Sequence, residues 1–205
     1  MAFEIFRASS YKIEKDSLYF LDANIWIFIL APKNKPANST QHYIKLFEDI
    51  LNEESVKIVV PAMLISEVVN RILRDVSYDN FLHSINTKRS SVHSRHYKDV
   101  FRPSAAFKDA YEVLVNDFVA YSDSIKFVDD GFGVDVSTDQ ILDSPPTSLD
   151  FNDNYYYSLA ISRGYKIITD DGDFWTENLK IITQNAVLLE KQNQVNIANY
   201  AARKR

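Results

Sequence analysis

A short apolar run that ends in a dense acidic turn, at residues 165–174, constrains the fold of this chain more than any other stretch. The run is rich in β-branched residues and too short for a helix, so it is predicted to form a buried β-strand. It leads directly into Asp170, Asp171 and Asp173. The sequence therefore predicts a strand that delivers several carboxylates to the point where the strand meets solvent.

A second apolar run, at residues 18–21, ends in the same way, in Asp22. Between the two runs, stretches with apolar residues at helical spacing alternate with further short apolar runs. That alternation predicts an α/β fold with a parallel sheet. Because the carboxyl ends of parallel strands meet at one edge of a sheet, we expect Asp22 to lie beside the acidic turn, where open α/β sheets bind their ligands.

The remaining elements are predicted from periodicity and from turn residues. Strands are expected at residues 56–60, 125–128 and 179–183, with an N-terminal arm or edge strand within 1–17. Helices are expected at 41–52, 61–73, 105–121, 138–142 and 151–163, and Gly164 is predicted to end the last of these in a left-handed conformation. Residues 25–30 are apolar on every side, which predicts a short helix that is buried all round.

The composition limits what a site in this chain can contain. The 205 residues are 46% hydrophobic, enough for the core of a single domain with an insertion. No cysteine is present, so disulfides, thiolate zinc sites and cysteine nucleophiles are excluded, and any metal must bind through oxygen or imidazole. The four glycines form no phosphate-binding loop, which argues against nucleotide-cofactor enzymes. The formal net charge of −5 is compatible with an acidic site and a local basic patch.

No targeting segment is expected from this sequence. The N-terminus lacks the apolar core of a signal peptide, and the longest apolar run, residues 25–31, is far too short to cross a bilayer. The lack of cysteine fits a reducing compartment. We therefore expect a cytoplasmic location and no membrane partner.

Asp153 is the acidic residue whose position is most informative. On a helical wheel it falls inside the apolar sector of the helix at 151–163, where an ionised carboxylate is costly unless something binds it. A first-turn aspartate that interacts with the helix N-terminus, with Asp150 as the N-cap, explains the position equally well. Both interpretations stay open on helix geometry alone.

Asp22 and Glu67 each have an ordinary structural explanation as well. Asp22 alone would be interpreted as the cap of the next helix, and the Asp171-Gly172 step as a solvated turn. Glu67 lies on the polar face of its helix, where Arg71 at i+4 could pair with it. What favours a site is the predicted meeting of two acidic strand ends and an acidic helix start at one sheet edge.

A cluster of carboxylates without cysteine matches one kind of metal chemistry. Mg²⁺ and Mn²⁺ prefer oxygen ligands in near-octahedral geometry and keep several waters. Without a cation, clustered carboxylates repel one another and raise each other's pKa. With one, such a site can activate a water and stabilise the charge that develops on a phosphodiester. The cluster therefore indicates phosphoryl chemistry.

Four short motifs, each with at least one acidic residue, follow one another along the chain. They are FLDAN at residues 20–24, ISEV at 65–68, Asp153 eleven positions before Gly164, and IITDDGDF at 167–174. In order and context they resemble the four acidic motifs of PIN domains, the metal-dependent nucleases that include many toxin–antitoxin ribonucleases. The resemblance spans residues 18–184, and its last motif is the most specific.

The resemblance implies a fold, a site and a reaction. The implied fold is α/β, a three-layer PIN-like domain with a central parallel sheet flanked by helices and a helical insertion. The implied acidic quartet around Mg²⁺ or Mn²⁺ consists of Asp22, Glu67, Asp153 and Asp171, with Asp173 as an additional metal partner and with Asn24, Asp150 and Thr169 as supporting residues. The implied reaction is hydrolysis of RNA by a metal-activated water. A homodimer and an inhibiting antitoxin protein are the implied partners.

The chain departs from the small toxin nucleases of this family in length. The extra segment, about residues 77–149, is interpreted as a helical and basic insertion in a single domain that spans 1–205. Its cations could hold RNA phosphates, with an affinity that falls as salt rises. They are Lys88, Arg89, Arg95, Lys98 and Arg102. A solvated polar face explains the same pattern.

Two other functions compete with a ribonuclease. A PIN-like scaffold that binds RNA or protein without catalysis would keep the fold but not need the quartet. A magnesium phosphatase of the haloacid-dehalogenase type is suggested by Asp22-Ala23-Asn24, which superficially resembles that family's first motif. That family needs a second aspartate where Asn24 stands, so this alternative ranks last.

Overall fold

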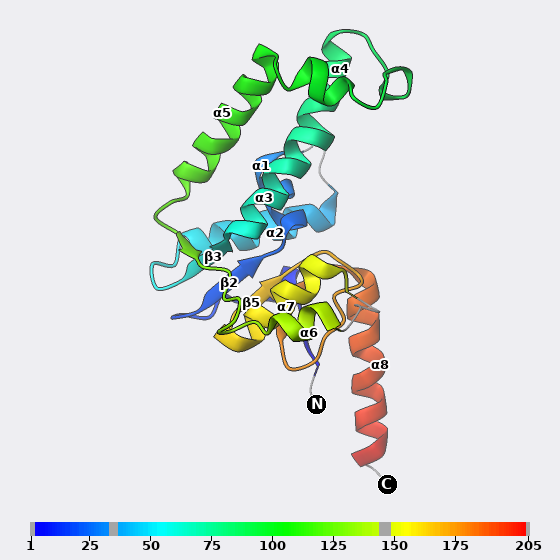
Figure 1. Ribbon diagram of the computed structural model, residues 1–205. Helices are drawn as coiled ribbons and strands as arrows, with labels where there is room; N and C mark the ends of the chain where they lie inside the picture. The colour runs from blue at the N-terminus through cyan, green and yellow to red at the C-terminus, as the bar shows by residue number, and fades with distance from the viewer. Residues whose placement is uncertain (1–2, 33–36, 144–148, 204–205) are drawn as a thin grey trace.

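The computed structural model describes residues 3–32, 37–143 and 149–203, and a sheet of six parallel strands runs through them (Figure 1). In spatial order the strands are β1 (Glu4–Arg7), β6 (Lys180–Thr183), β5 (Lys166–Ile168), β2 (Leu18–Leu21), β3 (Lys57–Pro61) and β4 (Ile125–Val128). Every pairing is parallel. The α/β fold with a parallel sheet is therefore confirmed, and the N-terminal segment supplies an edge strand.

Helices connect the strands. The α-helices of the described residues are α1 (Ala23–Leu30), α2 (Asn38–Leu51), α3 (Ala62–Arg71), α4 (Tyr78–Ser84), α5 (Ala105–Ala120), α6 (Thr138–Asp143), α7 (Phe151–Arg163) and α8 (Ala186–Arg203). Short 3₁₀ turns occur at η1 (Ala8–Ser10) and η3 (Arg89–Ser91), and π-helical turns at η2 (Ile72–Ser77) and η4 (Tyr97–Phe101). Among these residues, no helix combines the length and the apolar character that a membrane span requires.

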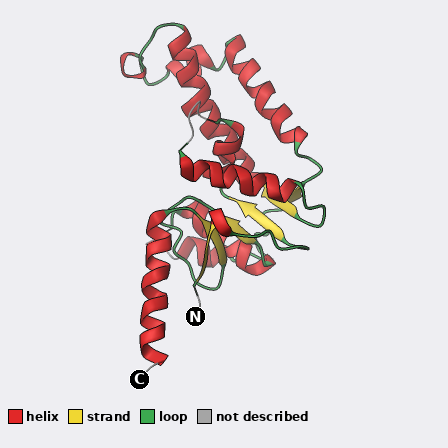
Figure 2. Ribbon diagram, turned by 180° about the vertical axis from the view of Figure 1, so that it is seen from behind, coloured by secondary structure: helices red, strands yellow, loops and turns green. Residues whose placement is uncertain are grey.

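The order of the strands fixes which helices cover which face. From β2 the chain moves outward to β3 and β4 through α1, α2, α3 and α5, and it then returns to the other side of β2 through α6 and α7. Because parallel crossovers are right-handed, the two directions place their helices on opposite faces of the sheet. Figures 1 and 2 show α1–α3 on one side of the strands and α6–α7 on the other. The reversal makes the gap between β2 and β5 the topological switch point.

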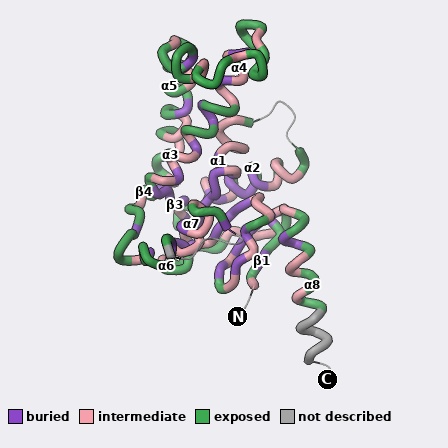
Figure 3. The backbone as a smooth tube through the Cα atoms, turned by 45° about the vertical axis from the view of Figure 1, so that its right-hand side comes forward, coloured by how far each residue is buried: buried purple, intermediate pink, exposed green. Residues whose placement is uncertain are grey.

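The core lies on both faces of the central strands. Tyr19, Phe20 and Leu21 of β2 are buried, as are both isoleucines at the end of β5. Figure 3 shows this buried region in the middle of the molecule. Full burial of a large apolar side chain contributes about 1.5–3 kcal/mol relative to exposure. The strand ends that carry the acidic residues are thus anchored by the most completely buried part of the chain.

Most predicted elements have the expected type, with ends shifted by a few residues. Gly164 follows α7 with φ 69° and ψ 31°, the left-handed cap predicted for it. The prediction of a helix buried all round at residues 25–30 is wrong for its second half. Ile25 and Trp26 are buried, but the residues from Ile27 to the end of α1 are partly exposed. A short helix that packs on one sheet face cannot cover all of its sides.

Residues 72–104, from η2 to the start of α5, form an arm that projects away from the sheet (Figure 1). A separate small cluster of buried residues, Tyr78, Leu82 and Phe101, holds it together. The predicted insertion at 77–149 includes β4, which belongs to the main sheet. The part of that segment with a core of its own is therefore the arm, and the assignment of an insertion within a single domain stays a prediction.

Candidate metal centre

Asp22 follows β2 directly and lies at the switch point. Its carboxylate accepts hydrogen bonds from the backbone N–H of Ala23 at 2.6 Å, from Asn24 Nδ2 at 2.7 Å and from Thr169 Oγ1 at 2.7 Å. The side chain caps α1 and at the same time faces the end of β5. The structural and the functional interpretation of Asp22 are therefore compatible, because one carboxylate serves both contacts.

In the acidic turn after β5, Asp170 and Asp171 contact different parts of the molecule. Asp170 accepts a hydrogen bond of 2.6 Å from the buried Tyr43 hydroxyl of α2, and the Asn185 amide donates to its backbone oxygen at 2.7 Å. The backbone N–H of Asp171 donates to Thr169 Oγ1 at 3.0 Å. Thr169 thus links Asp171 to Asp22, whereas Asp170 is held by α2. This difference supports the choice of Asp171 over Asp170.

Asp153 comes from the first turn of α7, which packs on the other face of the sheet. Its backbone N–H donates to Asp150 Oδ1 at 2.9 Å, so Asp150 is the N-cap that the sequence predicted. Burial, the largest cause, raises the pKa of Asp153 to about 8. The other causes of this increase are the negative charges of Asp22, Asp150, Asp171 and Glu67. Asp153 therefore lies among the other acidic side chains and does not serve only the helix end.

Glu67 of α3 reaches across to α7. Its Oε2 accepts hydrogen bonds from Tyr156 Oη at 2.9 Å and Asn152 Nδ2 at 3.0 Å, and its Oε1 lies 3.6 Å from Arg71 Nη1. The side chain is 21% exposed. The i+4 ion pair expected for a surface glutamate is present, but the contacts to α7 bring the same carboxylate toward Asp153.

Tyr156 and Asn152 were not predicted as site residues. They lie one turn apart on α7, a spacing that places two donors on one helix face, and this was the signal available in the sequence. On the helical wheel, Tyr156 belongs to the apolar sector of α7. Its ring is buried, whereas its hydroxyl reaches Glu67. A tyrosine on an apolar face can thus carry a polar contact at the ring's far end.

Burial also acts on Asp22. It raises the pKa of Asp22 to about 6, while the hydrogen bonds from Thr169 and from the Ala23 N–H oppose the increase. The negative charges of Glu67 and Asp171 add to the increase. We refer to Asp22, Glu67, Asp153 and Asp171 together as the carboxylate edge. They come from β2, α3, α7 and the loop after β5, and each influences the charge of another.

Asp173 has a different position. It is exposed, and its backbone N–H donates to Asp171 Oδ1 at 2.8 Å. The contact with the carboxylate edge is therefore made by the backbone of Asp173. Its predicted role as an additional metal ligand stays a prediction.

The donor set of the carboxylate edge fits a hard divalent cation. All four groups are carboxylates, which suit Mg²⁺ and Mn²⁺, and a bound cation would offset both the burial and the neighbouring negative charges that raise the pKa of Asp153. Within the parts of the chain that the structure describes, no three acidic or histidine side chains already converge as ligands of one ion. Asp22 and Glu67 instead direct oxygens toward hydrogen-bond donors.

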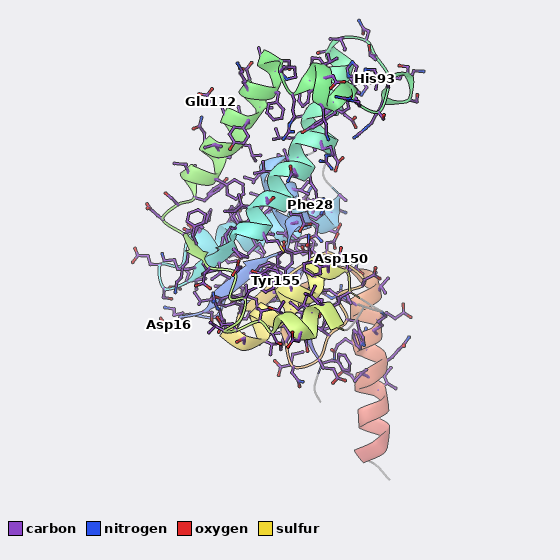
Figure 4. All side chains as sticks on the ribbon, viewed as in Figure 1. Asp16, Phe28, His93, Glu112, Asp150 and Tyr155 are labelled. Atoms are coloured by element: carbon purple, nitrogen blue, oxygen red, sulfur yellow. The ribbon has the colours of Figure 1, made fainter. Side chains whose placement is uncertain are left out.

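The basic residues predicted to bind RNA lie on the arm. Arg89 Nη1 is 3.1 Å from Asp79 Oδ1, and Arg95 Nε is 3.3 Å from Asp99 Oδ2, so part of the expected positive charge is neutralised. The other three, which are Lys88, Lys98 and Arg102, are exposed. Figure 4 shows His93 at the far end of the arm and Asp150 beside the sheet. The arm does not bring these cations next to the carboxylate edge.

Comparisons with known proteins show what this chain is similar to. The family model described as PIN domain matches residues 19–176. A solved structure described as VapBC2 from Rickettsia felis bound to a DNA fragment from their promoter is 16% identical, with a TM-score of 0.41, and the match covers 80% of this chain and 96% of that chain. Comparison with curated proteins gives no significant match. Since the family match covers well over half of its length, this chain belongs to the PIN domain family, whose members are generally nucleases that use divalent metal ions.

Proposed function

We propose that this protein is a metal-dependent endoribonuclease that hydrolyses RNA phosphodiester bonds. The observation that carries the proposal is that four carboxylates come from four elements around the switch point of the sheet, with the pKa of Asp153 raised first by burial and then by the charges of the other three and of Asp150. Such an accumulation of negative charge is costly unless a cation binds there. Membership of the PIN domain family supports the same chemistry.

The roles of the residues follow from their contacts. Asp22, Glu67, Asp153 and Asp171 would hold Mg²⁺ or Mn²⁺. A divalent cation bound by such residues supplies Lewis-acid chemistry, in which water is acidified and negative charge on the phosphate is stabilised. Thr169 and Asn24 fix the orientation of Asp22 by donating to its Oδ2.

The remaining contacts act on α3 and α7, the two helices that carry Glu67 and Asp153. Tyr156 and Asn152 orient Glu67, and Asp150 fixes the first turn of α7, which carries Asp153. These contacts hold the helices that carry Glu67 and Asp153 in place before a metal ion binds. That preorganisation lowers the cost of assembling the site when metal and substrate arrive.

A direct test uses labelled single-stranded RNA with Mn²⁺, with EDTA and Asp22→Asn or Asp171→Asn as controls. Cleavage that needs Mn²⁺ and is lost in both variants is the expected result. Cleavage that persists with EDTA and in both variants would remove the metal mechanism. A single-stranded DNA of the same sequence tests the preference for RNA, which rests on the resemblance to toxin ribonucleases.

One observation favours the non-catalytic alternative. The Glu67 carboxylate already contacts Tyr156, Asn152 and Arg71, so it must be partly released before it can bind a metal ion. A scaffold without catalysis would need no such release. RNA binding without cleavage at saturating Mn²⁺ would favour the scaffold.

The biological setting extends beyond the site. A role as the toxin of a toxin–antitoxin pair, an antitoxin partner, a homodimer and a cytoplasmic location are proposals from the family resemblance. Arrest of growth on expression, relieved by a protein encoded beside it, would support the toxin role. An expressed, active enzyme that leaves growth unchanged would contradict it.

A further inference from the structure

The arm carries a cavity of about 470 Å³ that has no part in the carboxylate edge. Its volume lies within the range of sites that bind small molecules or parts of larger ones. The residues that matter for its chemistry are Arg74, Tyr78, Arg89, His93, Tyr97 and Lys98. No aspartate or glutamate lines it, although the chain as a whole has a formal charge of −5.

Two guanidinium groups in this cavity are stacked on tyrosine rings. Arg74 lies 5.8 Å from the centre of the Tyr97 ring, and Arg89 lies 5.4 Å from the centre of the Tyr78 ring. Stacking fixes a flexible side chain while leaving N–H groups available for phosphate oxygens. The flat face of a guanidinium is also a platform on which a nucleobase can stack. The cavity thus offers two features that a nucleotide can use together.

The positive charge of the cavity is only partly neutralised. Arg89 pairs with Asp79 and with Asp75. Within the described residues, neither Arg74 nor Lys98 has a carboxylate within ion-pair distance. Residues 72–104 contain six of the 23 Lys and Arg residues and three of the 28 Asp and Glu residues, so they are locally positive in an acidic chain. A polyanion would therefore be attracted to the arm more strongly than to the rest of the chain.

We propose that this cavity is a remote subsite for single-stranded RNA, which binds a backbone phosphate and an adjacent base some distance from the scissile bond. The identity of the ligand rests on the proposed ribonuclease function. An acidic peptide could pair with the cations, but it has no base to stack on the guanidinium groups. RNA offers both a phosphate and a base, so it fits the whole cavity better. The arm would then anchor RNA while the carboxylate edge cleaves it.

The position of the cavity gives the proposal a specific consequence. Figure 4 shows His93, which lines the cavity, at the opposite end of the arm from the sheet. A short RNA bound at the carboxylate edge cannot also occupy the cavity, whereas a long RNA can. The subsite should therefore lower KM for long RNA and leave the cleavage of a dinucleotide unchanged.

The binding test uses Asp171→Asn protein, which should bind RNA without cleaving it, and a long labelled single-stranded RNA titrated at several salt concentrations. Arg74→Gln with Lys98→Gln should weaken binding about tenfold or more and make log K less steep in log salt by roughly 0.7 per lost phosphate contact. Lys108→Gln with Lys126→Gln removes the same charge from exposed positions outside the arm and should change binding much less.

Three results would overturn the subsite. The first is equal weakening by the cavity pair and by Lys88→Gln with Arg102→Gln, because that would indicate a diffuse basic face. The second is competition by polyglutamate as strong as competition by unlabelled RNA. The third is an unchanged KM for long RNA when the cavity pair is introduced into the active enzyme.

A variant of the ring tests the stacking separately. Tyr97→Leu keeps an apolar side chain but removes the ring under Arg74, and it should weaken RNA binding about tenfold while affecting inorganic polyphosphate less. Equal loss for both ligands would contradict base stacking. If pocket-dependent binding persists but no Mn²⁺-dependent cleavage is found, the ribonuclease proposal fails and the subsite stands. If cleavage is found but the cavity variants change nothing, the subsite alone fails.

Discussion

The carboxylate edge and the arm differ in how their side chains are held. At the carboxylate edge, two of the four acidic groups accept hydrogen bonds from another element, Asp22 from Thr169 and Glu67 from Tyr156. On the arm, a small buried cluster around Phe101 supports the part of the chain beyond the main core, and charged contacts such as Arg89 with Asp79 are exposed. Like charges can be kept together where the sheet fixes them. The arm is instead held by its own small core and by contacts among aromatic rings, such as those of Tyr78 with Tyr97 and Phe101.

The largest effect is expected from a variant that removes one charge from the carboxylate edge and leaves the fold intact. Asp171→Asn should lower the rate of RNA cleavage at saturating Mn²⁺ by at least about 100-fold, because it removes a charge from the group that would hold the metal. The melting temperature in EDTA should stay the same or rise, since repulsion among the carboxylates decreases. Initial rates and a thermal melt check both statements.

Asp173→Asn is the matched control for Asp171→Asn. It removes the same charge two positions away, from an exposed residue whose backbone makes the contact with the site. Its rate should fall much less. Equal loss in the two variants would show that the acidic loop acts as a whole and that no single carboxylate of it is special.

The next prediction breaks the arm and spares the sheet. Phe101→Ala removes the centre of the small cluster, a loss of about 3–5 kcal/mol for a buried phenylalanine. Amide hydrogen exchange should speed up across residues 78–101 while β2 and β5 stay protected. Cleavage of a dinucleotide should persist. One cooperative unfolding of the whole chain would mean that the arm and the sheet are a single unit.

The pH dependence of stability should reveal the carboxylate edge directly. In EDTA the folded protein keeps a proton on Asp153 up to its pKa of about 8, whereas the unfolded chain releases this proton at about pH 4. The folded state therefore binds more protons across that interval, and the free energy of unfolding should fall as pH rises from about 4 to 8. Asp22, with a pKa of about 6, adds to the fall up to that pH.

Thermal melts between these pH values measure this slope. Asp153→Asn should flatten it, since the amide does not titrate. Mn²⁺ should restore stability most strongly at the high end of the interval, where the carboxylates are ionised. A stability that rises with pH in EDTA would mean that these groups are not held close together.

A smaller effect is expected where Glu67 is oriented. Tyr156→Phe removes only the hydroxyl that donates to Glu67, a hydrogen bond to a charged group worth about 1.5–3 kcal/mol. The Mn²⁺ concentration for half-maximal activity should rise about tenfold or more, because Glu67 is no longer oriented. The maximal rate should change less. Tyr157→Phe, whose hydroxyl donates to the backbone oxygen of Glu177, is the control. Similar shifts in both would indicate general loosening of α7.

The two regions also differ in how far their structure could be predicted from the sequence. The parallel sheet and the meeting of Asp22 with Asp171 follow from strand ends, because chain direction alone brings those residues to one edge. The contact of Tyr156 with Glu67 joins residues 89 positions apart, and no local pattern encodes it. The buried α1 was predicted incorrectly because packing on one face, not composition, decides which sides are covered.

The arm was the harder part to predict for a physical reason. Its basic residues were predicted to hold RNA phosphates or to form a solvated polar face, whereas the ion pair of Arg89 with Asp79 and the position of Arg74 over the Tyr97 ring depend on how its turns are placed. The π-helical turn η2 between α3 and α4 lies outside the 3.6-residue period on which helix prediction rests. Local periodicity therefore defines the sheet better than it defines the arm.

The smallest expected effect refines the role of the arm. Asp79→Asn removes the carboxylate 3.1 Å from Arg89, and both side chains are close to half exposed, so the loss of stability should stay below about 1 kcal/mol. Arg89 would then keep only its longer contact with the Asp75 carboxylate and would bind a phosphate more readily, so the affinity for long RNA should rise about two- to threefold. Asp99→Asn frees Arg95, which does not line the cavity, and should raise affinity less. Equal gains in affinity from the two variants would mean that only the net charge of the arm matters, because Arg89 lines the cavity and Arg95 does not.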